Sequence, residues 1–245
     1  MSITSTYGTM QRQIADELGD NQQLLSPLSD SSLTLSPIQN AIQQAIAKWE
    51  REQFYFNQLL IQTPLSGPYP WQTSNGQEFY SESTTPAAWT GPDFSSVAYY
   101  KKIWVMVATN RYYLTFRTAE YMADIAVNAS WSGQPVDISI TDQMARLYPV
   151  PDNTYPIGII GTRRFANLST DSDSNVWTNE AYDLIRSEAK LQIARDVIYD
   201  QEAAEAAYRA IYGDPGLPSD RGFLNALKGE TTNRIARARV RPTYF

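Results

Sequence analysis

Three stretches of the sequence carry residue types at spacings that can do chemistry or bind a charged partner. Glu50 and Glu52 bring two carboxylates together, as the acid and base of a glycoside hydrolase require. Residues 171–175 read Asp-Ser-Asp-Ser-Asn and resemble the start of a calcium-binding loop. Residues 234–241 contain four arginines, which can bind phosphates or an acidic surface. Each pattern also has a purely structural explanation.

The glutamate pair and the aspartate loop both fail on spacing. Side chains two residues apart on a helix point about 200° apart, so Glu50 and Glu52 cannot converge on one bond from a helix. We therefore interpret them as part of a charged face, solvated or between subunits. In the loop, the sixth position of a calcium site should be glycine and is Val176, and the twelfth should be glutamate and is Tyr182. The loop is predicted to be a polar lead into a helix.

Two residue types are missing altogether. The chain of 245 residues contains no cysteine and no histidine. Catalysis by Ser-His or Cys-His pairs is therefore excluded, together with thiolate metal sites and almost all zinc and non-haem iron sites. A glycine-rich phosphate loop is also absent. The sequence predicts no catalytic residue, no metal and no cofactor.

The charge of the chain is unevenly distributed. The formal net charge is −6. Residues 221–245 hold six basic side chains and one acidic side chain, a net charge of +5, so the rest of the chain carries −11. An acidic body with a basic end indicates an interaction segment. With 42% hydrophobic and 19% charged residues the chain is globular, and its 16 tyrosines and 6 tryptophans suit either interfaces or a core. No apolar run approaches the ~20 residues that span a bilayer, and the first residues lack the pattern of a signal peptide.

Helical periodicity dominates both ends of the sequence. Ser36-Pro37 is a helix start, and the stripe that follows includes Ile42, Ile46, Trp49 and Phe56. Near the other end, Thr178 is expected to cap a helix over residues 180–200, whose apolar face includes Leu184 and Ile185. Two more helical segments are predicted at residues 201–212 and 220–239.

The middle of the chain has the features of β-structure. Residues 103–108 and 112–116 are rich in β-branched and aromatic side chains around a short turn, which predicts a hairpin. A helical period over 118–128 follows, and then three short candidate strands at 136–140, 144–148 and 155–160. The predicted class is α+β, mainly helical.

The order of these elements predicts a division into two parts. Residues 1–62 and 178–245 are expected to form a helical bundle, and residues 63–177 a β-rich insertion. The residues expected in the core or in packing between subunits are Ile42, Ile46, Trp49, Phe56, Trp177, Leu184 and Ile185.

Five segments carry a family likeness. They are residues 7–18 (YGTMQRQIADEL), 42–57 (IQQAIAKWEREQFYFN), 146–152 (RLYPVPD), 177–186 (WTNEAYDLIR) and 239–245 (RVRPTYF). In this order they resemble the head-to-tail adaptor proteins of tailed bacteriophages, also called connector or head-completion proteins. The likeness spans nearly the whole chain, with a middle that is longer and more divergent than in compact members.

The resemblance implies a structural protein of the virion, located at the head–tail interface and assembled in the host cytoplasm. Adaptors of this type form a ring, commonly of twelve subunits, beneath the portal protein. The ring extends the channel through which double-stranded DNA passes without sequence recognition, and it attaches the next tail or nozzle protein. No membrane is involved. An acidic body fits this role, because like charge keeps DNA from adhering as it passes.

The basic C-terminal segment, residues 234–245, is the part to which the resemblance assigns portal docking. The residues concerned are Arg234, Arg237, Arg239, Arg241, Tyr244 and Phe245. Two other interpretations remain open: a solvated helix end, where cations favour the helix dipole, and contact with DNA phosphates.

Three functions therefore follow from the sequence. The first is a ring-forming adaptor. The second is a tail-associated peptidoglycan hydrolase acting through Asp or Glu, since a related type of tail protein is associated with that activity. The third is a nucleic-acid-binding module that uses the basic segment. The lack of histidine and cysteine favours the first, and the negative net charge opposes the third.

Overall fold

A computed structural model describes residues 5–19, 22–26, 35–61, 71–81, 97–126, 131–141, 144–217 and 222–237. The chain divides into two compact units. One comprises residues 1–57 and 165–245, and the other comprises residues 58–164. We call them the helical unit and the β-rich unit. Together they give a mixed α+β fold, which confirms the α+β part of the predicted class.

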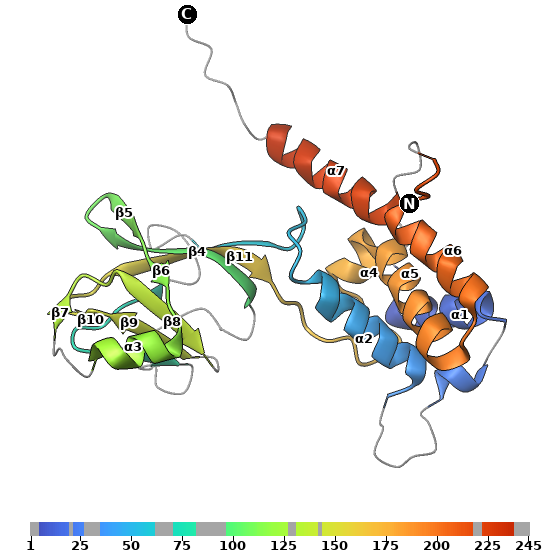
Figure 1. Ribbon diagram of the computed structural model, residues 1–245, viewed down its shortest axis with the longest axis horizontal. Helices are drawn as coiled ribbons and strands as arrows, with labels where there is room; N and C mark the ends of the chain where they lie inside the picture. Colours follow the sequence, from blue (N-terminus) through green and yellow to red (C-terminus); the bar gives the residue numbers. More distant parts are fainter. Residues whose placement is uncertain are drawn as a thin grey trace, which may run out of the picture. The chain divides into compact units, whose positions relative to one another are not determined.

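The helical unit is formed by helices from both ends of the chain (Figure 1). They are α1 (Tyr7–Glu17), η1 (Gln22–Leu25), α2 (Pro37–Trp49), α4 (Val176–Glu180), α5 (Tyr182–Ile193), the π-helical segment η4 (Ala194–Ile198), α6 (Gln201–Tyr212) and α7 (Gly222–Arg237). Helix α5 is central, because α1, α2, α6 and α7 all contact it. Its buried face therefore brings the two ends of the chain into one core.

Helix starts in this unit follow from capping side chains. Ser36 accepts a hydrogen bond from the Gln39 amide while the Gln39 side chain accepts from the Ser36 amide, a complete capping box. Asn175 caps α4 in the same way, with Thr178 as its partner at the third helical position. The prediction that Thr178 is itself the cap is therefore wrong. Asn175 comes three residues earlier, and its carboxamide reaches the first free amides of the helix.

The described residues of the β-rich unit form two main sheets and one short helix. The first sheet has the order β1–β11–β4–β5, with β2 also paired to β11. The second has the order β3–β9–β8–β6, and β7 pairs with β10 separately. The elements are β1 (Gln58–Ile61), β2 (Trp71–Gln72), β3 (Phe79–Ser81), β4 (Val97–Val107), β5 (Asn110–Tyr113), β6 (Thr115–Phe116), α3 (Ala119–Ala126), β7 (Ser132–Gly133), β8 (Asp137–Thr141), β9 (Met144–Tyr148), β10 (Val150–Pro151) and β11 (Pro156–Arg163).

The β-rich unit has its own apolar core. Trp71, Ile103 and Val105 from the first sheet are fully buried, as are Ile138 and Leu147 from the second. The predicted hairpin corresponds to β4 and β5, although its strands begin and end at other residues. The predicted strands at 136–140, 144–148 and 155–160 correspond to β8, β9 and β11.

The structure differs from the sequence prediction at the ends of the long helices. Helix α2 stops at Trp49, because the Asn57 side chain organises a turn just after it. The Asn57 amide donates to the Glu52 carbonyl, and its oxygen accepts from the Phe54 amide, both at 2.8 Å. The predicted helix over 180–200 is α-helical only to Ile193 and then continues as the π-helical η4.

Candidate interaction surfaces

Helix α7 is seated on the turn that follows α2 by contacts to one tyrosine. The Tyr55 amide donates to the Thr231 hydroxyl at 3.2 Å. The Arg234 guanidinium lies 3.7 Å from the centre of the Tyr55 ring and pairs with Glu230 at 2.5 Å. The Tyr55 hydroxyl in turn donates to the Glu180 carboxylate of α4. Through its amide, its ring and its hydroxyl, Tyr55 thus joins the turn after α2 to α7 and to α4.

The side chains of Tyr55 and Arg234 each keep one protonation state across the physiological pH range. Burial, followed by the hydrogen bond to the Glu180 carboxylate, raises the pKa of Tyr55 to about 12. The hydrogen bond to Glu230 raises the pKa of Arg234. Lys228 adds an ion pair to Glu52 at 3.4 Å, with both side chains nearly half exposed. The seat therefore holds α7 without a switch near neutral pH.

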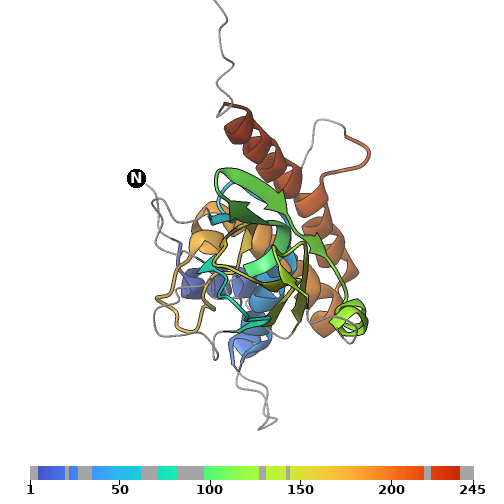
Figure 2. The same cartoon turned by 90° about the vertical axis from the view of Figure 1, so that its left-hand side faces the viewer.

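This seat directs the end of α7 away from the other helices of the unit (Figures 1 and 2). Arg234 is exposed and paired as described, and Arg237 is the last residue of α7. The other residues predicted to dock on the portal are Arg239, Arg241, Tyr244 and Phe245, which lie outside the described residues. Of the residues predicted to dock on the portal, the structure therefore places Arg234 and Arg237 on α7.

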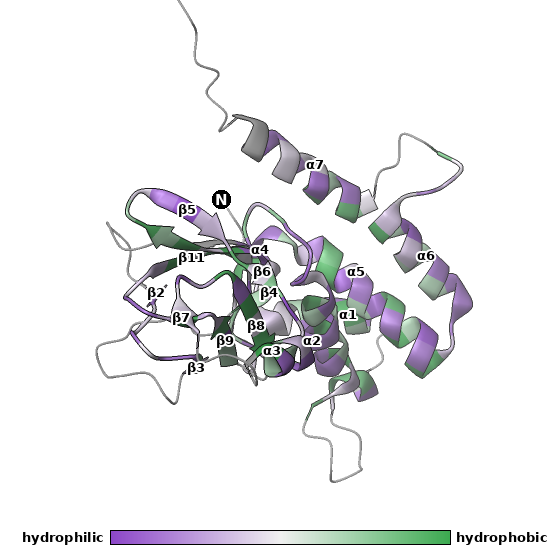
Figure 3. Cartoon of the chain, turned by 60° about the vertical axis from the view of Figure 1, so that its left-hand side comes forward, coloured by the Kyte–Doolittle hydropathy of each residue, from purple (hydrophilic) through white to green (hydrophobic). Residues whose placement is uncertain are grey.

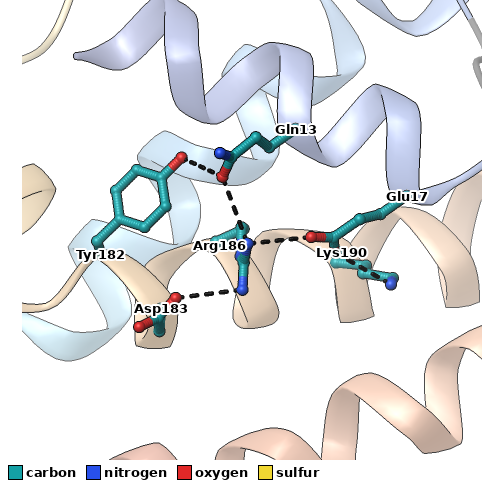
Figure 4. Close-up of polar contacts among 6 residues, drawn as sticks. All are labelled: Gln13, Glu17, Tyr182, Asp183, Arg186 and Lys190. Atoms are coloured by element: carbon teal, nitrogen blue, oxygen red, sulfur yellow. Dashed lines mark hydrogen bonds and ion pairs between the residues drawn. The ribbon is translucent and has the colours of Figure 1, made fainter. Parts of the chain in front are cut away.

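A second polar cluster joins α1 to α5 (Figure 4). The Tyr182 hydroxyl donates to the Gln13 side chain at 2.6 Å, and Arg186 donates to the same oxygen at 3.3 Å. Arg186 also pairs with Glu17 at 3.0 Å and with Asp183 at 3.1 Å. Lys190 also pairs with Glu17, at 3.2 Å. The cluster is a tie between two helices, because every charged group in it has an opposite charge beside it.

The residues predicted to form the core or to pack between subunits lie in the core of the helical unit. Ile42, Trp49, Trp177, Leu184 and Ile185 are buried there. Ile46 and Phe56 are partly buried against the same core. The Phe56 ring meets the Trp177 ring edge-to-face with centroids 5.1 Å apart.

Glu50 and Glu52 do not form a catalytic pair. Both lie beyond the end of α2, so the helical geometry assumed from the sequence does not apply to them. Glu50 is buried and accepts a hydrogen bond from the Phe165 amide at 3.4 Å. Glu52 is exposed and faces Lys228. The two carboxylates serve different structural contacts.

The loop at 171–175 locks α1 to the start of α4. The Asp173 carboxylate accepts bonds from the amides and hydroxyls of Ser169 and Thr170, at 2.5 to 3.0 Å. These bonds, above all the one from the Thr170 hydroxyl, lower the pKa of Asp173 well below its ordinary value. The Asp173 and Asp171 carbonyls accept from the first amides of α1. Among the described residues, no group of three or more acidic side chains is arranged to hold a metal ion.

A groove of about 740 Å³ lies where α2, α5 and α6 meet. Its wall includes Glu188 and Gln192 of α5, and its rim includes Tyr199, Tyr208 and Tyr212. No sequence pattern described above predicts this groove. A signal was present, because Glu188 falls three and four residues after Ile185 and Leu184 and so lies on the apolar face of the helix.

Exposed aromatic and basic side chains gather on the β4–β5 hairpin of the β-rich unit. All four residues of β5 are exposed, among them Tyr112 and Tyr113. Arg111 lies over the Trp104 ring at 5.3 Å, and Lys102 over the Tyr113 ring at 5.4 Å. In Figure 3 much of β5 is coloured as hydrophilic. Among the described strands, β5 is paired with β4 alone, so it is an edge of its sheet.

Comparison with known families gives a match over residues 5–241, to the family described as SU10 adaptor protein. The chain belongs to the SU10 adaptor protein family. This is a family of phage head–tail adaptors, so the resemblance inferred from the five sequence segments is confirmed. A search of curated proteins gives no match.

Membership in the SU10 adaptor family indicates a structural protein of the virion, placed between head and tail and in contact with portal and tail proteins. None of the described helices combines the length and the hydrophobicity that a membrane crossing needs. The end of α7, the groove and the β4–β5 hairpin are thus candidate contact surfaces of an adaptor.

Proposed function

We propose that this SU10-family adaptor forms a ring beneath the portal, extends the DNA channel and provides the attachment surface for the tail. The observation that carries the proposal is the family match over residues 5–241, which covers both units of the chain. Twelve copies are expected in the ring, from the resemblance on which the sequence analysis rests. The basic C-terminal segment is proposed as the contact to the portal.

The seat of α7 supports this role for the basic segment. Tyr55 contacts α7 through its amide and its ring, so the last turns of the helix have a fixed direction. A docking segment that leaves a held helix loses less conformational entropy on binding than one that leaves a flexible end. Arginine is suited to such a contact because its fork of donors pairs with carboxylates in two places at once.

The charge distribution supports the conduit. Residues 1–57 and 165–220 carry seven basic and seventeen acidic side chains, a net charge of −10. A channel wall of this sign repels DNA phosphates and lets the duplex slide. The seventeen acidic side chains also explain why a basic segment is available for a protein partner rather than for DNA.

Removal of residues 237–245 tests the portal contact. We expect the truncated chain to keep its helical circular dichroism and its thermal transition, because the deleted residues follow the seat of α7. We expect it to lose co-sedimentation with portal-bearing heads. The matched control is Arg12→Gln with Arg51→Gln, which removes two exposed arginines of the same unit and should leave binding intact. Normal attachment of the truncated chain would refute the proposed role of the segment.

A further inference from the structure

Two residues that line the groove between α5 and α6 each carry a buried side-chain oxygen without a hydrogen-bond partner among the described residues. Glu188 is 3% exposed, and one of its carboxylate oxygens receives Lys48 Nζ at 2.6 Å. Within the described part of the chain, its other oxygen has no hydrogen-bond partner, and neither does Oε1 of Gln192. A buried acceptor without a donor is unfavourable, most of all when it belongs to a charged group. The groove therefore favours an occupant that brings donors.

The charge around the groove favours a cation as that occupant. Its lining includes Glu188, Asp200 and Glu205 against Lys48 and Arg195. Glu188 pairs with Lys48, and Glu205 pairs with Arg209 at 3.7 Å, so the lining has one negative charge in excess, that of the exposed Asp200. Arg195 is already neutralised by a two-point contact with Asp196, at 2.6 and 2.9 Å.

The rim of the groove favours the same occupant. Tyr199 is 81% exposed, and Tyr208 is 52% exposed although its ring packs against Tyr212 with centroids 4.6 Å apart, so each of the two rings has exposed surface for stacking. A guanidinium supplies several donors in one plane and stacks on aromatic rings, which matches both features.

The β4–β5 hairpin offers the complementary chemistry. Residues 97–113 contain Lys101, Lys102 and Arg111 and no acidic residue, a net charge of +3. Arg111 lies just after the tip of the hairpin and is exposed, as are Tyr112 and Tyr113 beside it. The helical unit without residues 221–245 carries −10, so the two surfaces attract each other between copies.

We propose that the groove of one copy receives the tip of the β4–β5 hairpin of a second copy. Arg111 donates to the free oxygens of Glu188 and Gln192, and the hairpin tyrosines pack against Tyr199 and Tyr208. The two surfaces are different patches, so the contact is heterologous and repeats from copy to copy, as a ring requires. This inference rests on the proposed ring and adds the residues that join its subunits.

A photo-crosslinking experiment on the full chain tests the contact. Tyr112→p-benzoylphenylalanine places the probe on the hairpin. The matched control is Tyr121→p-benzoylphenylalanine on α3, a tyrosine 41% exposed compared with 44% for Tyr112. Equal amounts of ¹⁴N- and ¹⁵N-labelled chain are mixed, in free solution and on assembled portal-bearing heads. We expect crosslinks of mixed isotope between the Tyr112 probe and the tryptic peptide of residues 196–209, and none from the control.

Two variants test which copy supplies the hairpin and which copy supplies the groove. Arg111→Gln removes the donor, and Gln192→Leu removes a free acceptor without a loss of fold, because an apolar side chain replaces an unpaired buried oxygen. We expect either change to lower the crosslink yield about tenfold, the effect typical of a central interface residue. A probe on the Gln192→Leu chain should still crosslink to the Arg111→Gln chain, whose groove is intact. The reverse pair should not crosslink.

The outcomes separate this contact from the alternatives. Crosslinks within one isotope only would mean that the hairpin occupies the groove of its own chain, and the proposal would be wrong. It would also be wrong if residues 238–245 of another copy filled the groove, or if no crosslink formed in either setting. Failure of the full chain to co-sediment with portal-bearing heads, with the Tyr112 crosslink still formed in free solution, would count against the proposed adaptor function and leave the subunit contact standing.

Discussion

At the scale of single residues, Asp173 shows how a motif that resembles a metal site can serve the fold. Its carboxylate accepts from two amides and two hydroxyls within the loop. Its backbone carbonyl accepts from the Tyr7 amide at 2.9 Å, which ties the loop to α1. The donors to the carboxylate are Ser169 and Thr170, which come just before the acidic run, and the contact to α1 uses only the backbone.

The first prediction concerns the pH dependence of this loop. The pKa of Asp173 is lower in the folded than in the unfolded chain, so the unfolded chain binds more protons at pH values below about 4. The carboxylate therefore stabilises the fold above that pH, and the contribution disappears as the pH falls through the folded pKa. Asp173→Asn should lower the melting temperature at pH 7. The difference from the wild-type chain should shrink steadily below pH 4.

Asp16→Asn is the control for this measurement, because Asp16 is an exposed acidic residue of the neighbouring helix α1. It should leave the melting temperature at pH 7 nearly unchanged. A difference between Asp173→Asn and wild type that stays constant from pH 7 to pH 2 would contradict the assignment.

A second residue-scale prediction concerns the contact between β11 and β4. A Cβ atom added at Gly158 would lie 2.2 Å from two atoms of the Trp104 ring, which is 1% exposed. The buried ring has no room to retreat, so Gly158→Ala should reduce the free energy of unfolding by about 1–3 kcal/mol. Chemical denaturation of the full chain, followed by tryptophan fluorescence, measures this loss.

Gly133→Ala in the same unit provides the comparison, because the nearest atom to its added Cβ would be 3.9 Å away. Its effect should stay within about 0.5 kcal/mol. Equal losses at the two glycines would show that the ring of Trp104 is not the cause.

At the scale of elements, the junction between η4 and α6 shows what a periodic sequence pattern cannot reveal. Apolar periodicity predicted helical structure on both sides of Asp200, and this is what the structure has. The change to a π-helical turn at Ala194 is not marked in the sequence by a glycine or a proline. It depends on tertiary packing of α5 against α6, together with capping of α6 by the Asp200 carboxylate at 3.0 Å from the Ala203 amide.

The third prediction follows from the backbone at this junction. Tyr199 has φ 60° and ψ 35°, a left-handed conformation that costs a residue with a side chain about 1–2 kcal/mol. Tyr199→Gly removes that strain and loses part of the gain to the larger freedom of glycine when unfolded, so a net stabilisation of about 0.5–1 kcal/mol is expected. Denaturation by urea measures it.

A control substitution at Val197 and the effect of Tyr199→Gly on association complete this test. Val197→Gly, two residues earlier and within the helical η4, should destabilise by about 1 kcal/mol, the opposite sign. Tyr199→Gly also removes a ring from the rim of the groove, so the chain should become more stable and associate less well. Destabilisation by Tyr199→Gly would mean that its ring contributes more to the fold than the backbone strain costs.

At the scale of the whole molecule, the sequence predicted two parts and the structure divides into two units at slightly different places. The chain passes from one unit to the other between residues 57 and 58 and between residues 164 and 165. The predicted insertion, by contrast, runs from residue 63 to residue 177. Leu59-Leu60-Ile61 is a short apolar run, which periodicity cannot assign to helix or strand. Its pairing with β11 decides the matter in favour of a strand. Residues 165–175 look like a loop, yet Leu168 is buried in the helical core.

The sequence carries a signal for the groove, but that signal does not identify a groove by itself. Glu188 and Gln192 are polar residues on or beside an apolar helical face, and that pattern alone fits a buried ion pair or a site for a partner. Only the three-dimensional arrangement shows that Lys48 satisfies one oxygen of Glu188 and leaves the other free. In the same way, an edge strand such as β5 is recognised by its missing neighbour, which no local pattern records.

The last prediction is that the two units fold independently. The β-rich unit begins with β1 and ends with β11, and these strands pair so that Gln58 lies opposite Thr162. Paired residues of antiparallel strands have Cα atoms about 4.5–5.5 Å apart, so the two chain crossings lie close together. A short Gly-Ser linker of about six residues can therefore replace residues 58–164 without strain on the helical unit. Each unit also has its own buried core, which is the physical requirement for folding alone.

Two shortened chains test this independence. The first joins residues 1–57 to 165–245 through the linker, and the second consists of residues 58–164. We expect a cooperative thermal transition in each, with a helical circular dichroism spectrum in the first and a β-type spectrum in the second. Leu184→Ala in the first chain, at a residue 1% exposed, should lower its stability by about 2–5 kcal/mol and so prove that the native core has formed. If both chains melted without cooperativity, the units would depend on each other for their stability, and the groove and the hairpin could not be treated as surfaces of separate bodies.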